Sequence, residues 1–560
     1  MISVTDCTLH RHDKNRLSLT GGFIAMQKAN VVFHPAYQVS EISPRLFGAF
    51  LEPLGSLVDG SMYNPEHPTA DEEGFRQDYM EALRKSGLPA VRLPGGNFVS
   101  GWDWKGSIGP KDQRKAQLDL AWCRYETNAV GLDEYLRWSE KVGFEPLYTI
   151  NLGTDSLKDA IHLVEYTTHE GGTYWSDLRK QYGHPAPYGI KTWYLGNEMD
   201  GPWQIGSRQK DPVGYGAQAN EVAKAIKWIH PDAETIVSMS AMPSLPTYPQ
   251  WDMDVLQQCY DTVDYISLHH YYSAPPGDYD AQLAASDSFE DVIRTRIALC
   301  DFIQSKLRAP RKMLFSFDEY GFMVLPPQPL HYGRGGNIGR DTLNAMIPKP
   351  PYRRRDPNDW STLDIIPGHK TTMVDALVNI SVLMTLIRHA DRVKIGCMTS
   401  GLAALATTDR DHVWKSITHY PYTQLIENCK GISLQPSVTC ETYDVPGYAN
   451  NDFDQYDDRH GVKLIEAAAS YDEKDGKLNL FIINRSWKKD IDLDIDVSGF
   501  KGYRLIDHTE MFSDDPDAVN TWEQPDRVLP QINTNTTMTD GIISVKARKL
   551  SWNMFRLEKA

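Results

Sequence analysis

The chain has 560 residues, which is too long for one ordinary domain, and its content of 41% hydrophobic and 24% charged residues is normal for a soluble globular protein. Its formal net charge is −16, which argues against a nucleic-acid partner because proteins that bind nucleic acids present a basic surface. The sequence contains no apolar run long enough to span a membrane, so we expect no membrane association.

The N-terminal region divides into two parts. Residues 1–25 lack strong hydrophobic periodicity and are interpreted as an extension that need not be ordered. They also lack the continuous apolar segment of a secretory signal. Residues 26–44 include the run ANVVFHPAYQVSEIS and are predicted to form one or two strands. Because chain termini often lie close together, we expect these strands to join a sheet near the C-terminus.

Residues 45–404 alternate between apolar runs and helical patterns. The expected strands are 46–52, 90–95, 146–153, 191–198, 234–241, 263–272, 312–320 and 392–398. The expected helices are 74–87, 132–143, 157–169, 214–230, 289–307 and 373–391. This repeated alternation predicts an α/β fold, a (β/α)₈ TIM barrel, as the catalytic domain.

Residues 405–560 change to short alternating runs separated by polar turns, such as KLNLFIINRS and DIDLDIDVSG. This pattern predicts a C-terminal β-sandwich domain, jelly-roll-like in architecture, that also takes in an N-terminal strand. The segment 324–370 is rich in Pro, Gly and Arg and follows the seventh expected strand. We expect it to lie over the barrel mouth as a lid or interface loop.

The expected barrel strands end in polar side chains, where a barrel of this kind places its active site. These strand ends carry Glu52, Arg92, Asn97, Asn151, Asn197, Glu198, His269, His270, Tyr271, Asp318 and Glu319.

Two of these residues, Glu198 and Glu319, end apolar runs on the fourth and seventh strands. An unpaired buried charge is costly, so a buried strand has no packing reason to end in Glu. Two carboxyl groups facing each other across a barrel mouth are the pattern of a glycosidase. The alternative for Glu198 is an ion pair with a barrel Arg or Lys. Since neighbours on a strand point to opposite faces, only one of Asp318 and Glu319 is expected to face the barrel axis.

The adjacent His269 and His270 invite a metal interpretation, but neighbours on a strand diverge and no HExxH motif or Cys cluster accompanies them. We expect one His to orient a carboxylate or hydroxyl, and no metal. Trp102, Trp104 and Trp122 are candidates for an apolar wall under a sugar, with core packing as the alternative for each.

Several ordered motifs resemble family 51 of the glycoside hydrolases, the retaining α-L-arabinofuranosidases. The similarity runs from about Met26 to the end and includes FGAFLEPLG, RLPGGNFVSGWDWKGSIGP, DLAWCRYETNAVG, WYLGNEMDGPWQIG, DYISLHHYY, FSFDEY, HADRVKI and LSWNMFRL. The resemblance implies a barrel plus a β-sandwich built from both chain ends. It also implies an intracellular homo-oligomer, often a hexamer, that needs no cofactor.

The same resemblance assigns roles to residues. It implies that Glu198 is the general acid/base and Glu319 the nucleophile. It places His269 near the catalytic carboxylates and Trp122 near the sugar. The residues implied to hold the terminal furanose are Glu52, Arg92, Asn97, Asn197 and Tyr271.

The chain departs from the family pattern around the pocket. Ser400 stands where the family commonly has a sugar-contacting Gln, His270 stands where Gln is expected, and Met323 replaces an expected aromatic residue. The 324–370 segment also looks enlarged. A shorter side chain at position 400 leaves room for a bulkier group or a water, so Ser400 is included among the substrate-binding candidates.

The leading prediction is a retaining, exo-acting enzyme that releases terminal α-L-arabinofuranosyl groups from arabinan- or arabinoxylan-type oligosaccharides. One alternative keeps the chemistry but changes the glycoside to a galactofuranoside, or to the substrate of an endo-β-glucanase or xylanase. A second is a non-catalytic carbohydrate-binding protein. Seven dispersed cysteines without a CxxC motif suggest reduced thiols, so we expect a cytoplasmic protein.

Overall fold

The computed structural model describes residues 28–122, 124–324, 371–409, 411–449 and 455–560. Predictions for residues 1–25 and for the 325–370 part of the expected lid, together with the side chain of Met323, therefore lie outside the described residues. Across the described chain, no helix combines the length and the apolar character that crossing a membrane requires.

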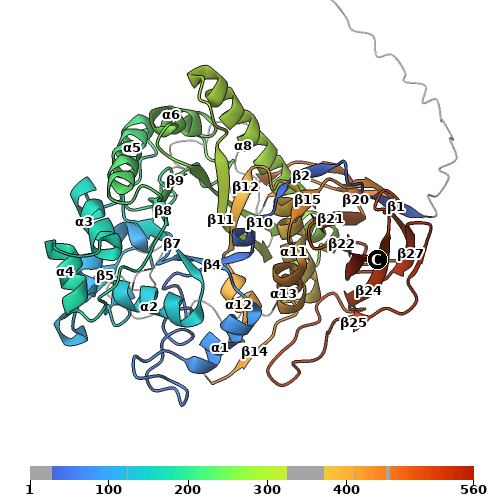
Figure 1. The fold of residues 1–560 in the computed structure, drawn as a ribbon, viewed down its shortest axis with the longest axis horizontal. Coiled ribbons are helices and arrows are strands. Elements are labelled where there is room, and N and C mark those ends of the chain that lie inside the picture. Colours follow the sequence, from blue (N-terminus) through green and yellow to red (C-terminus); the bar gives the residue numbers. More distant parts are fainter. Residues whose placement is uncertain (1–27, 123, 325–370, 410, 450–454) are drawn as a thin grey trace, which may run out of the picture.

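Eight parallel strands close into a barrel in the order β10-β11-β12-β3-β4-β7-β8-β9, which confirms the predicted TIM barrel (Figure 1). Each expected strand is present. Their bounds are β3 Gly48–Phe50, β4 Ala90–Leu93, β7 Glu145–Ile150, β8 Thr192–Leu195, β9 Glu234–Ser238, β10 Tyr265–Ala274, β11 Leu314–Val324 and β12 Val393–Met398.

Helices surround this barrel, and the six that the sequence predicts are all present. Their bounds are α1 Gln77–Ser86, α2 Leu132–Val142, α3 Leu157–Thr168, α5 Pro212–Ile229, α8 Ala285–Leu307 and α11 Met373–Arg388. Local chemistry sets their ends. In α3, the side chains of Ser156 and Asp159 cap each other's backbone N–H groups, and α1 stops at Gly87, whose φ of 72° suits glycine.

Shorter helices that the sequence analysis did not single out complete the outer layer. They are α4 Tyr174–Gln181, α6 Gln250–Cys259, α7 Tyr279–Leu283, α12 Gly401–Leu405 and α13 His419–Asn428, with 3₁₀ turns η1 Pro44–Phe47, η2 Val99–Gly101, η3 Trp104–Ser107 and η4 Lys111–Gln113. The Tyr422 hydroxyl of α13 donates to the Gly48 carbonyl of β3 at 2.7 Å. We therefore propose that the barrel domain extends through α13, beyond the expected boundary at residue 404.

The barrel interior is a packed core. Its inward-facing side chains come from strands all around the barrel and are Phe50, Ala90, Leu147, Tyr194, Ile236, Tyr265, Ile395 and Cys397. A filled interior leaves the mouth, at the C-terminal ends of the strands, as the place for a site.

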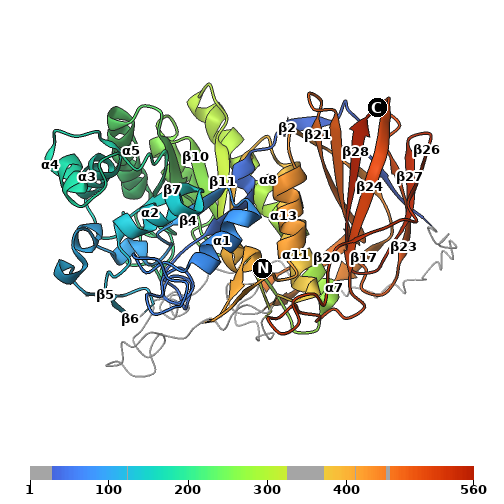
Figure 2. The same cartoon turned by 60° about the horizontal axis from the view of Figure 1, so that its bottom comes forward.

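The C-terminal part forms two facing sheets around a second apolar core, as the fold prediction expects (Figure 2). One sheet has the order β16-β1-β23-β27-β26 and the other β2-β15-β21-β22-β28-β24-β25. Strands β1 and β2 come from the N-terminal region, so both chain ends build this unit, as expected. The bounds are β1 Ala29–Val32, β2 Gln38–Glu41, β15 Ile432–Leu434, β16 Ser437–Thr439, β21 Ile465–Asp472, β22 Lys477–Asn484, β23 Ile491–Asp496, β24 Tyr503–Phe512, β25 Gln531–Ile532, β26 Thr537–Thr539, β27 Ile542–Ala547 and β28 Ser551–Lys559.

Within the described residues, four small two-stranded ribbons lie outside the barrel and the two large sheets. They are β5 Gln117–Asp119 with β6 Arg124–Glu126, β13 Thr407–Thr408 with β14 Val413–Trp414, β17 Thr442–Val445 with β20 Arg459–Lys463, and β18 Tyr448–Ala449 with β19 Gln455–Tyr456. Barrel and sandwich are joined through α11, where Arg388 donates to Glu466 Oε1 of β21 at 3.0 Å.

Candidate active site

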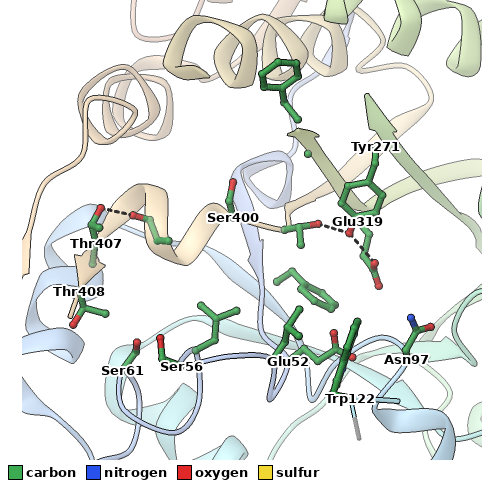
Figure 3. A pocket seen from close by; sticks show the side chains of 18 of the residues that line it. Glu52, Ser56, Ser61, Asn97, Trp122, Tyr271, Glu319, Ser400, Thr407 and Thr408 are labelled. Carbon is green, nitrogen blue, oxygen red and sulfur yellow. Dashed lines mark hydrogen bonds between the residues drawn. The ribbon is translucent and has the colours of Figure 1, made fainter. Parts of the chain in front are cut away.

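A cavity of about 430 Å³ opens at the C-terminal ends of the barrel strands. Its lining includes the predicted residues Glu52, Asn97, Trp122, Glu198, Tyr271, Glu319 and Ser400 (Figure 3). The other predicted residues, Arg92, Asn197 and His269, are buried and contact side chains of this lining. The structure thus brings all the predicted site residues together.

Glu198 and Glu319 face each other at the centre of the site. One carboxylate oxygen from each, together with a ring nitrogen of His269, lie within 4.8 Å of one another. This close approach of two oxygens is compatible with retaining glycosidases, whose carboxyl groups stand about 5–5.5 Å apart. The geometry therefore permits one carboxylate to attack an anomeric carbon directly while the other carboxyl group donates or accepts a proton.

Glu198 follows β8 in a strained loop. Its φ is 42°, a left-handed conformation that is rare for a residue with a side chain and is kept where function requires it. The Trp203 indole N–H donates to Glu198 Oε2 at 2.6 Å. Trp203 fixes one oxygen of the carboxyl group while Oε1 faces His269 at 3.1 Å.

Glu319 is held by two donors. Arg92 Nη1 lies 2.5 Å from Oε1, and the Tyr271 hydroxyl donates to Oε2 at 3.0 Å. Arg92 is fully buried on β4 and also donates to the Asn197 amide oxygen at 2.7 Å. The buried cation stabilises the negative charge of Glu319 and aligns its carboxylate with the site.

Gly96 lies against this carboxylate. A Cβ atom at position 96 would stand 2.5 Å from Glu319 Oε1, so only glycine lets the loop after β4 pass this close. The Gly96 and Phe98 backbone N–H groups donate to Glu52 Oε1 at 3.0 and 2.8 Å. Burial, and then the charge of Glu319, raise the pKa of Glu52 to about 8.

The expectation that only one of Asp318 and Glu319 faces the barrel axis is wrong. Strand pairing passes from Leu268↔Phe317 directly to His269↔Glu319, so a β-bulge at Asp318 breaks the alternation of side chains. Asp318 is fully buried and its Oδ2 lies 3.1 Å from Arg92 Nε. Both acids therefore point inward, with Asp318 beneath Glu319.

His269 lies between acidic groups on both sides. Its Nδ1 is 3.1 Å from Glu198 Oε1 and 3.6 Å from Glu319 Oε2, and its Nε2 is 3.2 Å from Asp318 Oδ2. Burial alone would lower the pKa of this imidazole. The charge of Glu319 and hydrogen bonds to Asp318 and Glu198 outweigh burial and raise the pKa to about 10. The ring is therefore an imidazolium at neutral pH and donates from both nitrogens.

His270 points away from this centre, as the divergence of strand neighbours predicts. Its Nε2 lies 2.9 Å from the Ser288 hydroxyl and its ring packs edge-on against Phe289. Burial, and then the charges of Arg296 and Arg459, lower its pKa to about 3, so it is neutral.

Glu198, His269 and Glu319 have a spacing that fits a metal ion. A histidine must be neutral to bind a metal, whereas the surrounding acids favour a proton on His269. This donor set therefore suits a protonated imidazole better than a metal site.

The three candidate tryptophans separate into two groups. Trp102 and Trp104 are core residues: the Trp102 indole donates to Asn128, and Trp104 packs against Trp175. Trp122 lines the cavity from the β5–β6 hairpin, where its backbone N–H donates to Asp119 Oδ1 at 3.1 Å. Of these three tryptophans, Trp122 alone remains a candidate for sugar contact.

Two residues near the carboxylates were not singled out by the sequence analysis. Trp203 holds Glu198, and Thr399 Oγ1 lies 2.8 Å from the Tyr271 hydroxyl. Position 203 falls within the WYLGNEMDGPW motif, and position 399 precedes Ser400. Both lie beside residues that the sequence had already marked.

The fold and the site define a class. A (β/α)₈ barrel that brings two carboxyl groups close together at the ends of its fourth and seventh strands has the architecture of a glycoside hydrolase.

Comparisons with known proteins give the family. The model described as "Alpha-L-arabinofuranosidase 1 domain" matches residues 80–291, and "Alpha-L-arabinofuranosidase C-terminal domain" matches residues 360–551. An "Intracellular exo-alpha-(1->5)-L-arabinofuranosidase" of Acetivibrio thermocellus is 36% identical over 95% of this chain and 100% of its own length. A Bacillus subtilis enzyme with the same designation, numbered 1, is 34% identical over the same shares.

Solved structures agree with these relatives. A family 51 α-L-arabinofuranosidase from Bifidobacterium longum superposes with a TM-score of 0.81 at 30% identity, covering 94% of this chain and 99% of that one. The chain belongs to the family 51 α-L-arabinofuranosidases. This confirms the resemblance stated above and favours neither another glycoside nor a non-catalytic protein.

Proposed function

We propose that this protein is an exo-acting, retaining α-L-arabinofuranosidase that releases terminal α-L-arabinofuranosyl groups from arabinan- or arabinoxylan-type oligosaccharides. The observation that carries the proposal is the separation of Glu198, His269 and Glu319 ligand atoms by no more than 4.8 Å. The printed designations of the relatives, exo-acting on α-(1→5) linkages, support arabinan-type substrates.

In the first step, Glu198 donates its proton to the glycosidic oxygen as the bond to the anomeric carbon breaks. Glu319 attacks that carbon and forms a covalent glycosyl ester. In the second step, ionised Glu198 takes a proton from water, the water attacks the same carbon, and the ester bond to Glu319 breaks. The sugar leaves with its original anomeric configuration, and Glu198 is again protonated.

The surrounding side chains position these two acids. Arg92 and Tyr271 direct Glu319, and Trp203 directs Glu198. The His269 imidazolium, next to both, stabilises whichever carboxylate is charged during the cycle.

We assign the remaining predicted residues to furanose binding. Glu52 is mostly protonated at neutral pH, because its pKa is about 8, and so donates a hydrogen bond to a sugar hydroxyl. The Asn197 amide N–H donates to the side-chain oxygen of Asn97, which lines the cavity, at 3.2 Å, and this contact supports a role for both amides in sugar binding. Trp122 and Ser400 complete the walls.

Location and assembly are also part of the proposal. The relatives carry the word "Intracellular" in their designations, and the five described cysteines are free, which supports a reducing, cytoplasmic setting. We propose a homo-oligomer, by resemblance a hexamer, to be checked by light scattering coupled to size exclusion. A monomer at micromolar concentration would contradict this.

A direct test uses Glu198→Ala and an aryl α-L-arabinofuranoside with a good leaving group. Because this leaving group needs no acid, the variant should form the glycosyl ester and then stall. Azide, which needs no general base, should restore turnover and give an azide adduct with retained configuration. Full activity of Glu198→Ala, or inverted configuration of the wild-type product followed by NMR, would refute the proposed mechanism.

A further inference from the structure

The active-site cavity continues past the two carboxyl groups. Its volume of about 430 Å³ lies within the range of about 300–1,000 Å³ that is typical of ligand pockets. Figure 3 shows Glu319, Tyr271 and Asn97 toward one end of the cavity and Ser400 in the middle. We call the opposite end the far end; it is lined by Ser56, Leu57, Ser61, Ala403, Thr407 and Thr408. A further group of the substrate can enter there.

Three serine hydroxyls face this space without a protein partner. Ser61, from the segment after β3, lines the cavity although its side chain is only 3% exposed. Figure 3 shows Ser56 beside it, with both side chains pointing into the cavity. Ser400, directly before α12, makes no capping hydrogen bond with its side chain. Among the described residues, none of the three hydroxyls has a hydrogen-bond partner, so they are free to bind a polar ligand.

Two threonines at the far end supply acceptors. The Thr407 hydroxyl donates to the Ala403 carbonyl at 2.8 Å, and the Thr408 hydroxyl donates to the His412 carbonyl at 2.9 Å. Because each proton is already engaged, the oxygen of each threonine is left to accept a hydrogen bond. The serines can donate as well as accept. The far end therefore suits a ligand whose own groups both donate and accept, as sugar hydroxyls do.

The far end carries no charge among the described lining residues. The charged residues of the lining, Glu52, Glu198 and Glu319, belong to the catalytic end. A uronic acid would find no cation at the far end to offset the cost of removing its carboxylate from water. Leu57 and Ala403 place apolar surface between the hydroxyl groups. A neutral sugar, which has hydroxyls at its rim and C–H groups on its faces, matches this lining.

The position of the far end indicates where such a sugar is attached. Strands β8 and β12 lie four places apart in the ring of eight, so their ends face each other across the barrel mouth. Glu198 follows β8 and the glycosidic oxygen must face it, whereas Ser400 follows β12. The part of the furanose remote from its anomeric carbon therefore lies toward Ser400. This part carries the primary hydroxyl, so a group attached there enters the far end.

We propose that the enzyme also releases, as an intact disaccharide, a terminal arabinofuranosyl group whose primary hydroxyl carries one further neutral sugar, with Ser56 and Ser61 binding that sugar. This inference rests on the proposed function. The bond that breaks is still the one between the arabinose anomeric carbon and the leaving group, and water adds across it in the same two steps. The linkage between the two sugars stays intact.

The test uses three nitrophenyl α-L-arabinofuranosides: one unmodified, one with a D-xylopyranosyl group on the primary hydroxyl, and one with a D-glucuronosyl group there. Ser56→Ala combined with Ser61→Ala removes two free hydroxyls, and Ala403→Leu adds bulk to the far end. Ala298→Leu is the matched control, because it makes the same change at an exposed position of α8 outside the cavity lining. Nitrophenol release gives kcat/KM, and mass spectrometry identifies the sugar product.

We expect the wild type to cleave the xylosyl and unmodified substrates with kcat/KM values within about tenfold of each other, and to release the xylosyl-arabinose disaccharide. The double serine variant and Ala403→Leu should each lower kcat/KM for the xylosyl substrate by about tenfold and leave the unmodified one unchanged. Ala298→Leu should change neither substrate.

The inference is overturned if the wild type rejects the xylosyl substrate, or if the far-end variants affect the xylosyl and unmodified substrates equally. It is also overturned if the glucuronosyl substrate is cleaved as well as the xylosyl one, because the far end would then not select a neutral sugar. Failure of the proposed function would show separately, since the wild type would not cleave the unmodified arabinofuranoside.

Discussion

The cavity has a catalytic end, with Glu319 and Tyr271, and a far end lined by Ser56, Ser61, Thr407 and Thr408, and the two ends differ in charge (Figure 3). At the catalytic end, Arg92 and His269 are buried and each faces more than one carboxylate. At the far end, the described lining carries hydroxyl and apolar side chains but no charged one. Chemistry at an anomeric carbon needs charges fixed in advance, and the catalytic end provides them.

The largest expected effect comes from the catalytic end. Glu319→Gln keeps the shape of the side chain but removes the nucleophile, so kcat on an aryl arabinofuranoside should fall by about 10⁴-fold or more. Steady-state kinetics on freshly purified protein, with circular dichroism as a folding control, measures this. Residual activity within tenfold of the wild type would contradict the role of Glu319 as the nucleophile.

A smaller loss is expected from Gly96→Ala. The new Cβ would stand 2.5 Å from Glu319 Oε1, so the nucleophile must move, and kcat should fall by about 10²-fold. Gly101→Ala is the matched control, because its Cβ would come no closer than 3.6 Å to Ile205. Equal activity of the two variants would mean that the exact position of Glu319 is unimportant.

The charge network should also make stability depend on pH. The folded-state pKa of His269 is about 10, above the ordinary value of 6.5, so its contribution to stability is complete below about pH 6.5 and is lost as pH rises through about 10. Thermal unfolding between pH 6 and 10.5 should show a steeper alkaline loss in the wild type than in His269→Gln. Parallel Tm curves would contradict the raised pKa.

The smallest effect is expected at the buried Tyr79 of α1. Tyr79→Phe removes a hydroxyl without a described partner, so the free energy of unfolding should change by less than about 0.5 kcal/mol or rise. Tyr422→Phe is the comparison, because its hydroxyl donates to the Gly48 carbonyl, and it should cost about 1 kcal/mol. Denaturant titration separates them; an equal loss in both would reveal a protein partner for Tyr79.

Much of the fold and of the active site can be predicted from the sequence, because the patterns that mark them involve residues close together in the chain. Apolar runs that end in polar residues mark the eight strands and place Glu198 and Glu319 at one mouth. The bulge at Asp318 could not be predicted, because alternation assumes a regular strand. Helix α13 escaped notice because it lies among short runs typical of strands, and its contacts with the barrel domain, such as that of Tyr422 with Gly48, join residues far apart in the sequence. The far end of the cavity depends on segments distant in sequence, after β3 and β12, and no single motif encodes it.

The most direct test of the central claim is to trap the glycosyl-enzyme. Glu198→Ala incubated with an activated aryl α-L-arabinofuranoside, quenched in acid and digested, should yield a peptide whose mass is raised by one arabinosyl group. Fragmentation should place that group on Glu319. Attachment to Asp318, or the absence of any adduct while the substrate is consumed with inversion, would contradict the account.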